Sequence, residues 1–295
     1  MTWPVSRARP IDTIKACAIG GPSPTTGASR PGYKKRMLST PIGTAAHGFT
    51  IRVLTVNIHK GLAFLSRRVV LPQLREAVRT VHADLVFLQE VQGASADAGD
   101  AADDALDAAH YEFLADQVWP QYAYGRNAVY PRGHHGNALL SKYPITRYDN
   151  HDASVDGHEP RGLLHCVLQP PEHSEAIHAI CVHLGLREAH RERQLEMLCS
   201  TIRTEVPDSQ LLIVAGDFND WRKRAHRRLA GCAGLQEVFV QAYGAAARTY
   251  PAGLPVLSLD RIYVRNAVAH APIVLPRRPW SWLSDHAPLA AEIRQ

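Results

Sequence analysis

Short runs of apolar residues, separated by polar segments, recur from residue 51 to residue 293. The first run, IRVLTVNI at residues 51–58, is apolar on both of its alternating faces. This pattern is typical of a strand that is covered on both sides. The same pattern predicts further strands at residues 84–91, 137–141, 162–168, 177–184, 211–217, 259–264 and 287–293.

Helices are predicted between several of these strands, at residues 69–82, 101–118, 188–206 and 221–230. In the first of them, Val70, Leu74 and Val81 recur at helical spacing. Residues 119–136, which contain Pro, Gly and two adjacent histidines, are predicted to form a loop. Doubly covered strands that are interspersed with helices indicate a layered α/β domain. One such domain is expected to span residues 49–295.

Residues 1–48 differ in composition, being rich in Pro, Gly, Ser, Thr and Arg without a sustained period. Such a segment cannot bury enough apolar surface to offset the entropy lost on ordering. We therefore expect a disordered basic leader. Two other origins stay open: an upstream start site, with Met37 as the true first residue, and an organellar transit peptide.

The basic charge of the chain is concentrated in this leader. The formal net charge is +5, and the first 50 residues carry seven basic side chains and one acidic side chain. The other 245 residues therefore hold 26 basic and 27 acidic side chains, a net charge of −1. The isoelectric point of about 9.0 thus indicates no nucleic-acid footprint on the body of the protein.

The five cysteines are scattered, odd in number and never spaced as CxxC. Cys166 and Cys181 lie inside apolar runs, where a reduced cysteine behaves as a small hydrophobic residue. This usage favours a reducing compartment and a cytoplasmic location, and it suggests no cysteine-based zinc site. No stretch approaches the roughly 18 uninterrupted apolar residues that a membrane-spanning helix needs, while peripheral membrane association stays open.

Polar side chains follow four of the predicted strands at the point where each strand ends. They are Asn57, Glu90, His183 and Asp217. A single carboxylate in such a position is more often an N-cap or a turn former than a ligand. Four such strand ends, together with Asp260 and the Ser-Asp-His run at residues 284–286, are difficult to attribute to capping. Strand ends are also where α/β folds place their functional residues.

These residue types suit metal-assisted phosphoryl chemistry. Oxygen ligands such as Glu90, Asp285 and Asn57 favour Mg²⁺ or Mn²⁺ over zinc. His183 and His286 can deliver and remove protons near neutral pH. Two proton transfers supply about 5–11 kcal/mol, whereas hydrolysis of a phosphate ester demands about 23 kcal/mol. A bound divalent ion is the natural source of the difference.

Two further residues can support this chemistry. Asp260 can hold one imidazole in the correct tautomer, as a carboxylate does in a hydrolytic triad. Asn219 lies two residues beyond Asp217 and can donate an uncharged hydrogen bond to an anionic oxygen.

Seven segments, in this order, resemble the motif series of the endonuclease/exonuclease/phosphatase (DNase I-like) superfamily. They are TVNIHKG (55–61), LVFLQEV (85–91), GNALLSKYPI (136–145), VHLGL (182–186), AGDFND (215–220), LDRIYV (259–264) and LSDHAPL (283–289). Each motif is weak alone, but the ordered set is highly specific. The similarity is greatest to bacterial members without an assigned substrate. It implies a four-layered α/β sandwich, in which two packed mixed sheets with an internal pseudo-repeat are flanked by helices and the active site lies at one rim.

The resemblance also implies a role for each matching residue. Glu90 would be the principal metal ligand, with Asn57 beside it and Asp285 nearby. His286 would be the base that activates water, and Asp260 would orient it.

Three further residues would complete the machinery. Asp217 and Asn219 would align the nucleophile and the phosphoryl group, and His183 would stabilise the developing charge or protonate the leaving oxygen. In the apurinic-endonuclease branch a tyrosine takes the position of His183. The histidine in this sequence is therefore similar to the pattern of the branch that contains pancreatic-type nucleases and sphingomyelinases. The inositol-phosphatase signature is absent, since residues 255–261 read PVLSLDR.

Other residues are candidates for substrate binding, namely Arg161, His135 and Asn137. His135 and its neighbour His134 belong to a predicted loop, so they are expected to be solvated more often than to contact substrate. For Arg161, a position on the surface is at least as frequent as contact with a phosphate. The basic helix residues Arg187, Arg191 and Arg193 favour a solvated face. Residues 221–224 (Trp-Arg-Lys-Arg) begin directly after the Asp217 loop, so they can either contact an anionic substrate or simply be solvated. Substrate contact is also open for His59 and Lys60.

The expected protein is thus a monomeric Mg²⁺- or Mn²⁺-dependent hydrolase of phosphodiesters. Its substrate can be nucleic acid, a lipid head group or a nucleotide, and phosphomonoesters stay open within the class. The near-neutral body lacks the strong basic stripe of a tight duplex binder. The alternative is a non-catalytic scaffold of the same fold that binds a phosphate ligand.

Overall fold

The computed structural model describes residues 49–62, 69–93, 109–116, 118–130, 133–155, 157–171 and 173–295. The leader expected at residues 1–48 lies outside these ranges, as do residues 101–108 of the helix predicted at 101–118. Within the described ranges, no helix is long and apolar enough to cross a membrane.

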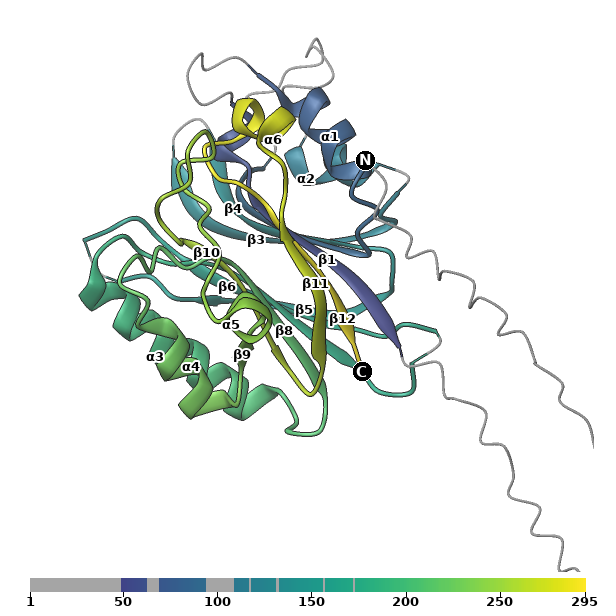
Figure 1. The fold of residues 1–295 in the computed structure, drawn as a ribbon, viewed down its shortest axis with the longest axis vertical. Helices are drawn as coiled ribbons and strands as arrows, with labels where there is room; N and C mark the ends of the chain where they lie inside the picture. The colour runs from purple at the N-terminus through teal and green to yellow at the C-terminus, as the bar shows by residue number, and fades with distance from the viewer. Residues whose placement is uncertain are drawn as a thin grey trace, which may run out of the picture. The chain divides into compact units, whose positions relative to one another are not determined.

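Two six-stranded mixed sheets form the centre of the domain (Figure 1). The first has the order β11-β12-β1-β2-β4-β3, with β1 Thr50–Asn57, β2 Leu85–Gln92, β3 Gln121–Tyr130, β4 Gly133–Ser141, β11 Val268–Val274 and β12 Leu289–Arg294. The second has the order β5-β6-β7-β8-β10-β9, with β5 Ile145–Asp152, β6 Gly162–Leu168, β7 Ile177–His183, β8 Leu211–Asp217, β9 Gln236–Glu237 and β10 Asp260–Arg265.

Helices cover the outer face of each sheet, which gives four layers (Figure 1). Over the first sheet lie α1 Leu71–Arg79, α2 His110–Ala115 and α6 Arg277–Leu283. Over the second lie α3 Glu188–Glu205 and α4 Ala225–Ala233, while α5 Val238–Tyr243 packs beside β11 and β10. A short 3₁₀ helix, η1 His59–Gly61, follows β1. The predicted α/β sandwich is confirmed.

Side chains alternate between the two faces of each central strand, and so they contribute to two separate apolar layers. In β7, Ile177, Ala179 and Cys181 face the apolar core between the sheets. Ile180 and Val182 point the other way and pack with the apolar side of α3. Because a strand has a side-chain period of two, a strand that is buried on both faces reads as one continuous apolar run.

The loop predicted at residues 119–136 is wrong. This segment forms β3 and the start of β4, which pair antiparallel across residues 131–132. β3 is an edge strand, so many of its side chains are exposed and its sequence lacks the apolar run of a central strand. Its backbone hydrogen bonds come from pairing with β4 rather than from a local signal.

A disulfide joins Cys199 of α3 to Cys232 of α4, while Cys166 and Cys181 are free and buried. The bond ties together the two helices that cover the second sheet. Disulfides are rare in reducing compartments. The finding therefore goes against the reducing compartment expected from the scattered cysteines.

The two sheets repeat one arrangement, which places the strand ends. β1 and β2 are parallel, and β7 and β8 are parallel, at the centre of their respective sheets. The antiparallel strands β12 and β10 begin beside the ends of β1 and β8. Consequently, the ends of two parallel pairs and the starts of two returning strands meet at one rim between the sheets.

Candidate active site

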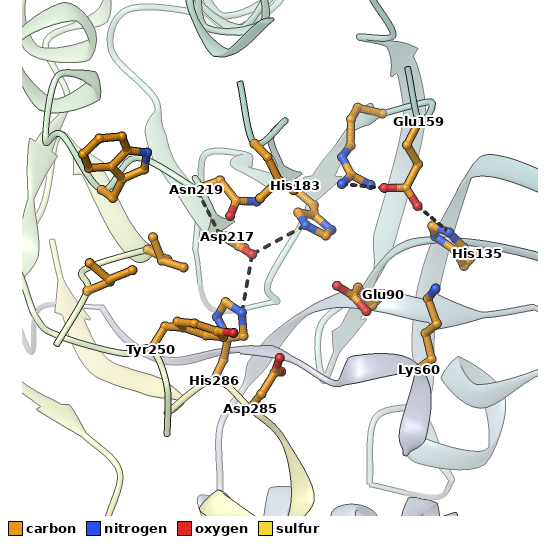
Figure 2. A pocket seen from close by; sticks show the side chains of 15 residues that line it. Lys60, Glu90, His135, Glu159, His183, Asp217, Asn219, Tyr250, Asp285 and His286 are labelled. Carbon is orange, nitrogen blue, oxygen red and sulfur yellow. Dashed lines mark hydrogen bonds and ion pairs between the residues drawn. The ribbon is translucent and has the colours of Figure 1, made fainter. Parts of the chain in front are cut away.

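All of the residues proposed for catalysis and metal binding come to this rim. Asn57 ends β1, His183 ends β7, Asp217 ends β8, Asp260 begins β10, and Asp285 and His286 precede β12. Figure 2 shows Glu90, His183, Asp217, Asn219, Asp285 and His286 around one pocket. The pocket has a volume of about 430 Å³.

Glu90 reaches the rim because β2 bulges. The pairing of β2 with β4 shifts between Leu88 and Val91, and Glu90 itself has a left-handed φ of 56°. A non-glycine residue with positive φ is uncommon and costs energy, and such residues cluster at functional sites. Asn219, Lys60 and His59 also have positive φ, so four residues around this rim share the feature.

Asn57 links the two halves of the site. Its Nδ2 donates to Glu90 Oε1 and to Asp217 Oδ2, each at 3.3 Å, and its Oδ1 accepts from the backbone N of His59 at 3.0 Å. Ser284 Oγ donates to the backbone O of Asn57 and so ties the segment before β12 to the end of β1. The first sheet's contribution is therefore held in place by hydrogen bonds on both sides.

His286 and Asp260 form a buried pair. His286 Nδ1 lies 2.8 Å from Asp260 Oδ2, and Nε2 lies 3.8 Å from Asp217 Oδ2. The backbone N of Asp260 donates to Thr249 Oγ1, and the ring of Tyr250 packs 5.0 Å from the ring of His286. The imidazole thus has one nitrogen held by a carboxylate and the other directed toward the pocket (Figure 2).

Asp217 is the shared neighbour of four residues, namely Asn57, His183, Asn219 and His286. Its Oδ1 accepts from the backbone N of Asn219 at 2.8 Å, and its Oδ2 lies 3.5 Å from His183 Nε2. Asn219 Nδ2 donates to the backbone O of Leu184, so the loop after β8 is fastened to the loop after β7.

Burial and charge shift the pKa values of these groups. Burial tends to lower the pKa of His286, but the carboxylates of Asp260 and Asp217 outweigh it and raise the pKa to about 10. Burial raises the pKa of Asp217 to about 6, against the opposing charge of His286. Burial also holds the pKa of His183 well below its usual value, with Arg161 and His286 adding to the effect. His183 is therefore a neutral imidazole at pH 7.

A second wall of the pocket comes from β4 and the segment before β6. Glu159 Oε1 lies 3.1 Å from His135 Nε2, and Glu159 Oε2 lies 2.8 Å from Arg161 Nη2. The hydrogen bond from His135 lowers the pKa of Glu159 to about 2 against the effect of burial, and Arg161 contributes to the same direction. Tyr130 Oη also donates to Glu159 Oε1 at 3.1 Å.

Several sequence-based expectations change here. His135 is buried within β4 rather than solvated in a loop, and Arg161 is 8% exposed rather than a surface residue. Arg191 is buried too, and it donates to the backbone O of Gly185 and Leu186. It therefore shapes the loop after His183 instead of lying on a solvated helix face.

Asn137 does not line the pocket. Its Nδ2 donates to the backbone O of Gly162 and of Cys181, which joins β4 of the first sheet to β6 and β7 of the second. The structure thus gives Asn137 an inter-sheet role. His134 lies nearby in β4, with Nδ1 2.9 Å from Tyr124 Oη.

Other lining residues carried no sequence signal. Glu159 and Tyr250 belong to irregular segments that only tertiary folding brings to the rim, and Leu186 and Leu257 add an exposed apolar margin. Trp221 lines the pocket as well, while its basic neighbours Arg222 and Arg224 pair with Glu188.

The donor set on the Glu90 side fits a divalent cation. Asp285 Oδ1 is buried with no hydrogen-bond partner, and His59 Nδ1 lies 3.5 Å from it. Burial raises the pKa of Asp285, and the charge of Glu90 raises it further, so two carboxylates repel each other here. Asp217, Asp260 and His286 also lie within ligand distance of one another. However, the hydrogen bond between Asp260 and His286 already uses those atoms.

Comparison with known proteins adds a family and a fold. The sequence model of the Endonuclease/Exonuclease/phosphatase family matches residues 54–286. The chain is 58% identical over 245 residues to the uncharacterized protein YbhP of Escherichia coli (strain K12), covering 83% of this chain and 96% of that protein.

Solved structures agree on the architecture. An endonuclease/exonuclease/phosphatase from Beutenbergia cavernae matches with a TM-score of 0.66 and 18% identity, over 83% of this chain and 71% of that chain. D. rerio TDP2 complexed with single strand DNA product matches with a TM-score of 0.62 and 16% identity, over 83% and 99% of the two chains.

Proposed function

The chain belongs to the endonuclease/exonuclease/phosphatase family, as its motif series predicts, and on this premise we propose that it is a divalent-metal-dependent hydrolase of phosphodiester bonds. One observation carries the proposal. A buried histidine held by a carboxylate, His286 with Asp260, faces the same pocket as the carboxylates of Glu90 and Asp285. Base and metal donors therefore surround one space that can hold a phosphorus atom.

Glu90, Asn57 and Asp285 would hold Mg²⁺ or Mn²⁺, which supplies Lewis-acid stabilisation of charge on the phosphoryl oxygens when bound. The base role falls to His286. Its Nε2 accepts the proton of the attacking water, and Asp260 accepts the hydrogen bond from Nδ1–H, which fixes the tautomer. This step requires a neutral imidazole, whereas the carboxylates of Asp260 and Asp217 raise the pKa of His286 to about 10. A divalent cation held by Glu90 and Asp285 would lower that pKa, because a nearby positive charge disfavours the imidazolium.

Asp217 and Asn219 orient the water and the phosphoryl group. Asp217 lies between His286 and His183, and it accepts a hydrogen bond from the backbone N of Asn219. His183 is neutral, which favours a hydrogen bond to the developing charge over full proton donation. Arg161 and His135 contact the substrate phosphate from the opposite wall.

This proposal admits several classes of phosphodiester substrate. Nucleic acid gains support from the D. rerio TDP2 structure, which holds a single strand DNA product. Lipid head groups and nucleotides fit the same chemistry, and the exposed Leu186 and Trp221 at the margin suit an apolar or aromatic leaving group. We propose that the protein acts as a monomer, because the residues assigned to catalysis and to metal binding all meet at the rim of a single domain. The cytoplasmic location is not carried into the proposal, since the disulfide argues against it.

The test uses the full-length protein with an activated aryl phosphodiester. We expect turnover with Mg²⁺ or Mn²⁺ that is abolished by EDTA. His286→Ala and Asp260→Asn should each lower kcat by roughly 10²–10⁴-fold, because a base or its orientation is lost. His270→Ala, on exposed β11 far from the rim, is the matched control and should match the wild type.

Three results would decide against parts of the proposal. Activity that is insensitive to EDTA would reject the metal, and full activity in His286→Ala would reject the base. Binding of phosphodiesters without any turnover would favour the non-catalytic scaffold instead. A screen of DNA, RNA, phospholipids, nucleotides and phosphomonoesters with the active protein then identifies the substrate.

A further inference from the structure

A second cluster of ligating side chains lies on the helix side of the second sheet. It contains His151 of β5, His165 of β6 and Glu205, the last residue of α3. One donor atom of each lies within 4.8 Å of the others. His165 neighbours His178, which sits five residues before His183 on β7. The cluster is therefore about 16 Å along that strand from the active-site end.

The carboxylate of Glu205 lies close to both imidazoles. Its Oε1 lies 3.3 Å from His151 Nε2, and its Oε2 lies 3.2 Å from His165 Nδ1. Tetrahedral ligands at about 2.0–2.1 Å from a zinc ion are separated by about 3.3 Å. Each imidazole nitrogen thus lies at this spacing from one oxygen of the carboxylate, and one donor atom of each of the three residues lies within 4.8 Å of the others.

A chain of hydrogen bonds determines which nitrogen of His165 carries a proton. Gln210 Oε1 accepts from His178 Nε2–H at 2.7 Å. His178 Nδ1 is then bare and accepts from His165 Nε2–H at 2.8 Å. His165 Nδ1 is consequently left with its lone pair facing the carboxylate of Glu205.

In this tautomer two acceptors, His165 Nδ1 and Glu205 Oε2, face each other, and the side chain of His165 is 1% exposed. His151 Nε2 is also buried without a hydrogen-bond partner. The cationic group that contacts Glu205 from the same sheet face is Arg147, whose Nη2 lies 3.6 Å from Oε2 and whose side chain is more than half exposed.

We propose that His151 Nε2, His165 Nδ1 and the carboxylate of Glu205 form a site for Zn²⁺ or a similar transition-metal ion, with a water molecule in the fourth position. Two imidazoles and one carboxylate are a zinc-type donor set, whereas the oxygen-rich active site suits Mg²⁺. His178 and Gln210 support the site by fixing the tautomer and the orientation of His165. The ion ties the edge strand β5 and its neighbour β6 to the end of α3.

The experiment titrates Zn²⁺ into the chelator-treated full-length protein in excess Mg²⁺, which occupies the active site. Binding is followed by calorimetry and by the midpoint of thermal unfolding. The wild type should bind one Zn²⁺ and gain several degrees in Tm. His151→Ala and Glu205→Gln should weaken this binding at least 100-fold, whereas the control His270→Ala and the active-site variant Glu90→Gln should retain it.

Two further readouts keep the test decisive. X-ray absorption at the zinc edge should report two imidazole nitrogens at about 2.0–2.1 Å. Glu205→Gln should cleave the aryl phosphodiester with Mg²⁺ at a rate within about twofold of the wild type, which also shows that the variant is folded. Equal Zn²⁺ affinity of the wild type and Glu205→Gln, or loss of the bound zinc in Glu90→Gln, would overturn the proposal. Anomalous diffraction that places zinc at the active site instead would do so as well.

Discussion

Arg161 lines the pocket and is held by Glu159, which lies across the pocket from His286 (Figure 2). Its guanidinium can therefore reach a substrate phosphate. Replacing it by Gln removes a charge-assisted hydrogen bond to phosphate, a contribution of about 1.5–3 kcal/mol. We therefore expect kcat/KM for a phosphodiester to fall about 10- to 100-fold, mainly through KM. Steady-state kinetics measure this. An exposed arginine of α3 provides the control, and Arg193→Gln should leave both constants unchanged. Unchanged kcat/KM in Arg161→Gln would remove this residue from the substrate wall.

The residues of the site differ in how readily they can be identified from the sequence. Asn57, Glu90 and Asp217 can be identified because each interrupts or ends an apolar run. Glu159 and Tyr250 cannot, since they lie in irregular segments whose path to the rim depends on strand pairing elsewhere. Conversely, positive φ at Glu90 has no local signature in the sequence, because the bulge in β2 is set by its register with β4.

A single buried residue, His110, makes the free energy of unfolding depend on pH. It begins α2, and burial lowers its pKa from 6.5 to about 4. A lowered pKa means that the unfolded chain binds the proton more tightly, so this stability is present above pH 6.5 and is lost as the pH falls toward 4. Between pH 8 and pH 5, His110 should account for a loss of about 2 kcal/mol in the free energy of unfolding. Urea denaturation of His110→Leu should show a correspondingly smaller loss. An exposed histidine gives the comparison, since His270→Leu should keep the full wild-type dependence.

At the scale of secondary-structure elements, Gly216 allows the strands β7 and β8 to approach each other closely. It pairs with Val182 across the parallel strands β7 and β8, and its φ is +146°. A Cβ there would lie 2.0 Å from the backbone O of Val182. Gly216→Ala must therefore push apart the two strands that carry His183 and Asp217. We expect a loss of more than about 2 kcal/mol in the free energy of unfolding, together with a lower kcat.

The matched control is Gly231→Ala in α4, where an added Cβ meets nothing within 4 Å. Alanine favours a helix over glycine by about 1 kcal/mol, so this variant should be as stable as the wild type or more stable. Chemical denaturation compares the two. Equal stability of both variants would show that the close approach at Gly216 relaxes without cost.

At the scale of whole elements, central strands were predictable and edge strands were not. β1, β2, β7 and β8 are covered on both faces, so their sequences are continuous apolar runs. β3, β5 and β11 have exposed faces and polar sequences, and they form because a neighbouring strand offers hydrogen bonds. The arrangement as two packed mixed sheets with an internal pseudo-repeat followed from the family resemblance, whereas the order of the strands in each sheet was not predicted, because apolar periodicity alone does not specify it.

The distribution of charge over the whole chain leads to a final prediction. The full chain carries +5, but residues from 51 onward carry −1, while the cores and the pocket are built from residues 49–295. We therefore propose that residues 49–295 are the catalytic domain. A chain that begins at Gly48 should hydrolyse a small aryl phosphodiester with the same kcat/KM as the full chain. Its affinity for DNA at low salt should be weaker, and the slope of log affinity against log salt should be shallower, because up to seven basic side chains are removed. Parallel salt titrations of the two chains measure this difference, and equal slopes would place the DNA-binding charge on the domain itself.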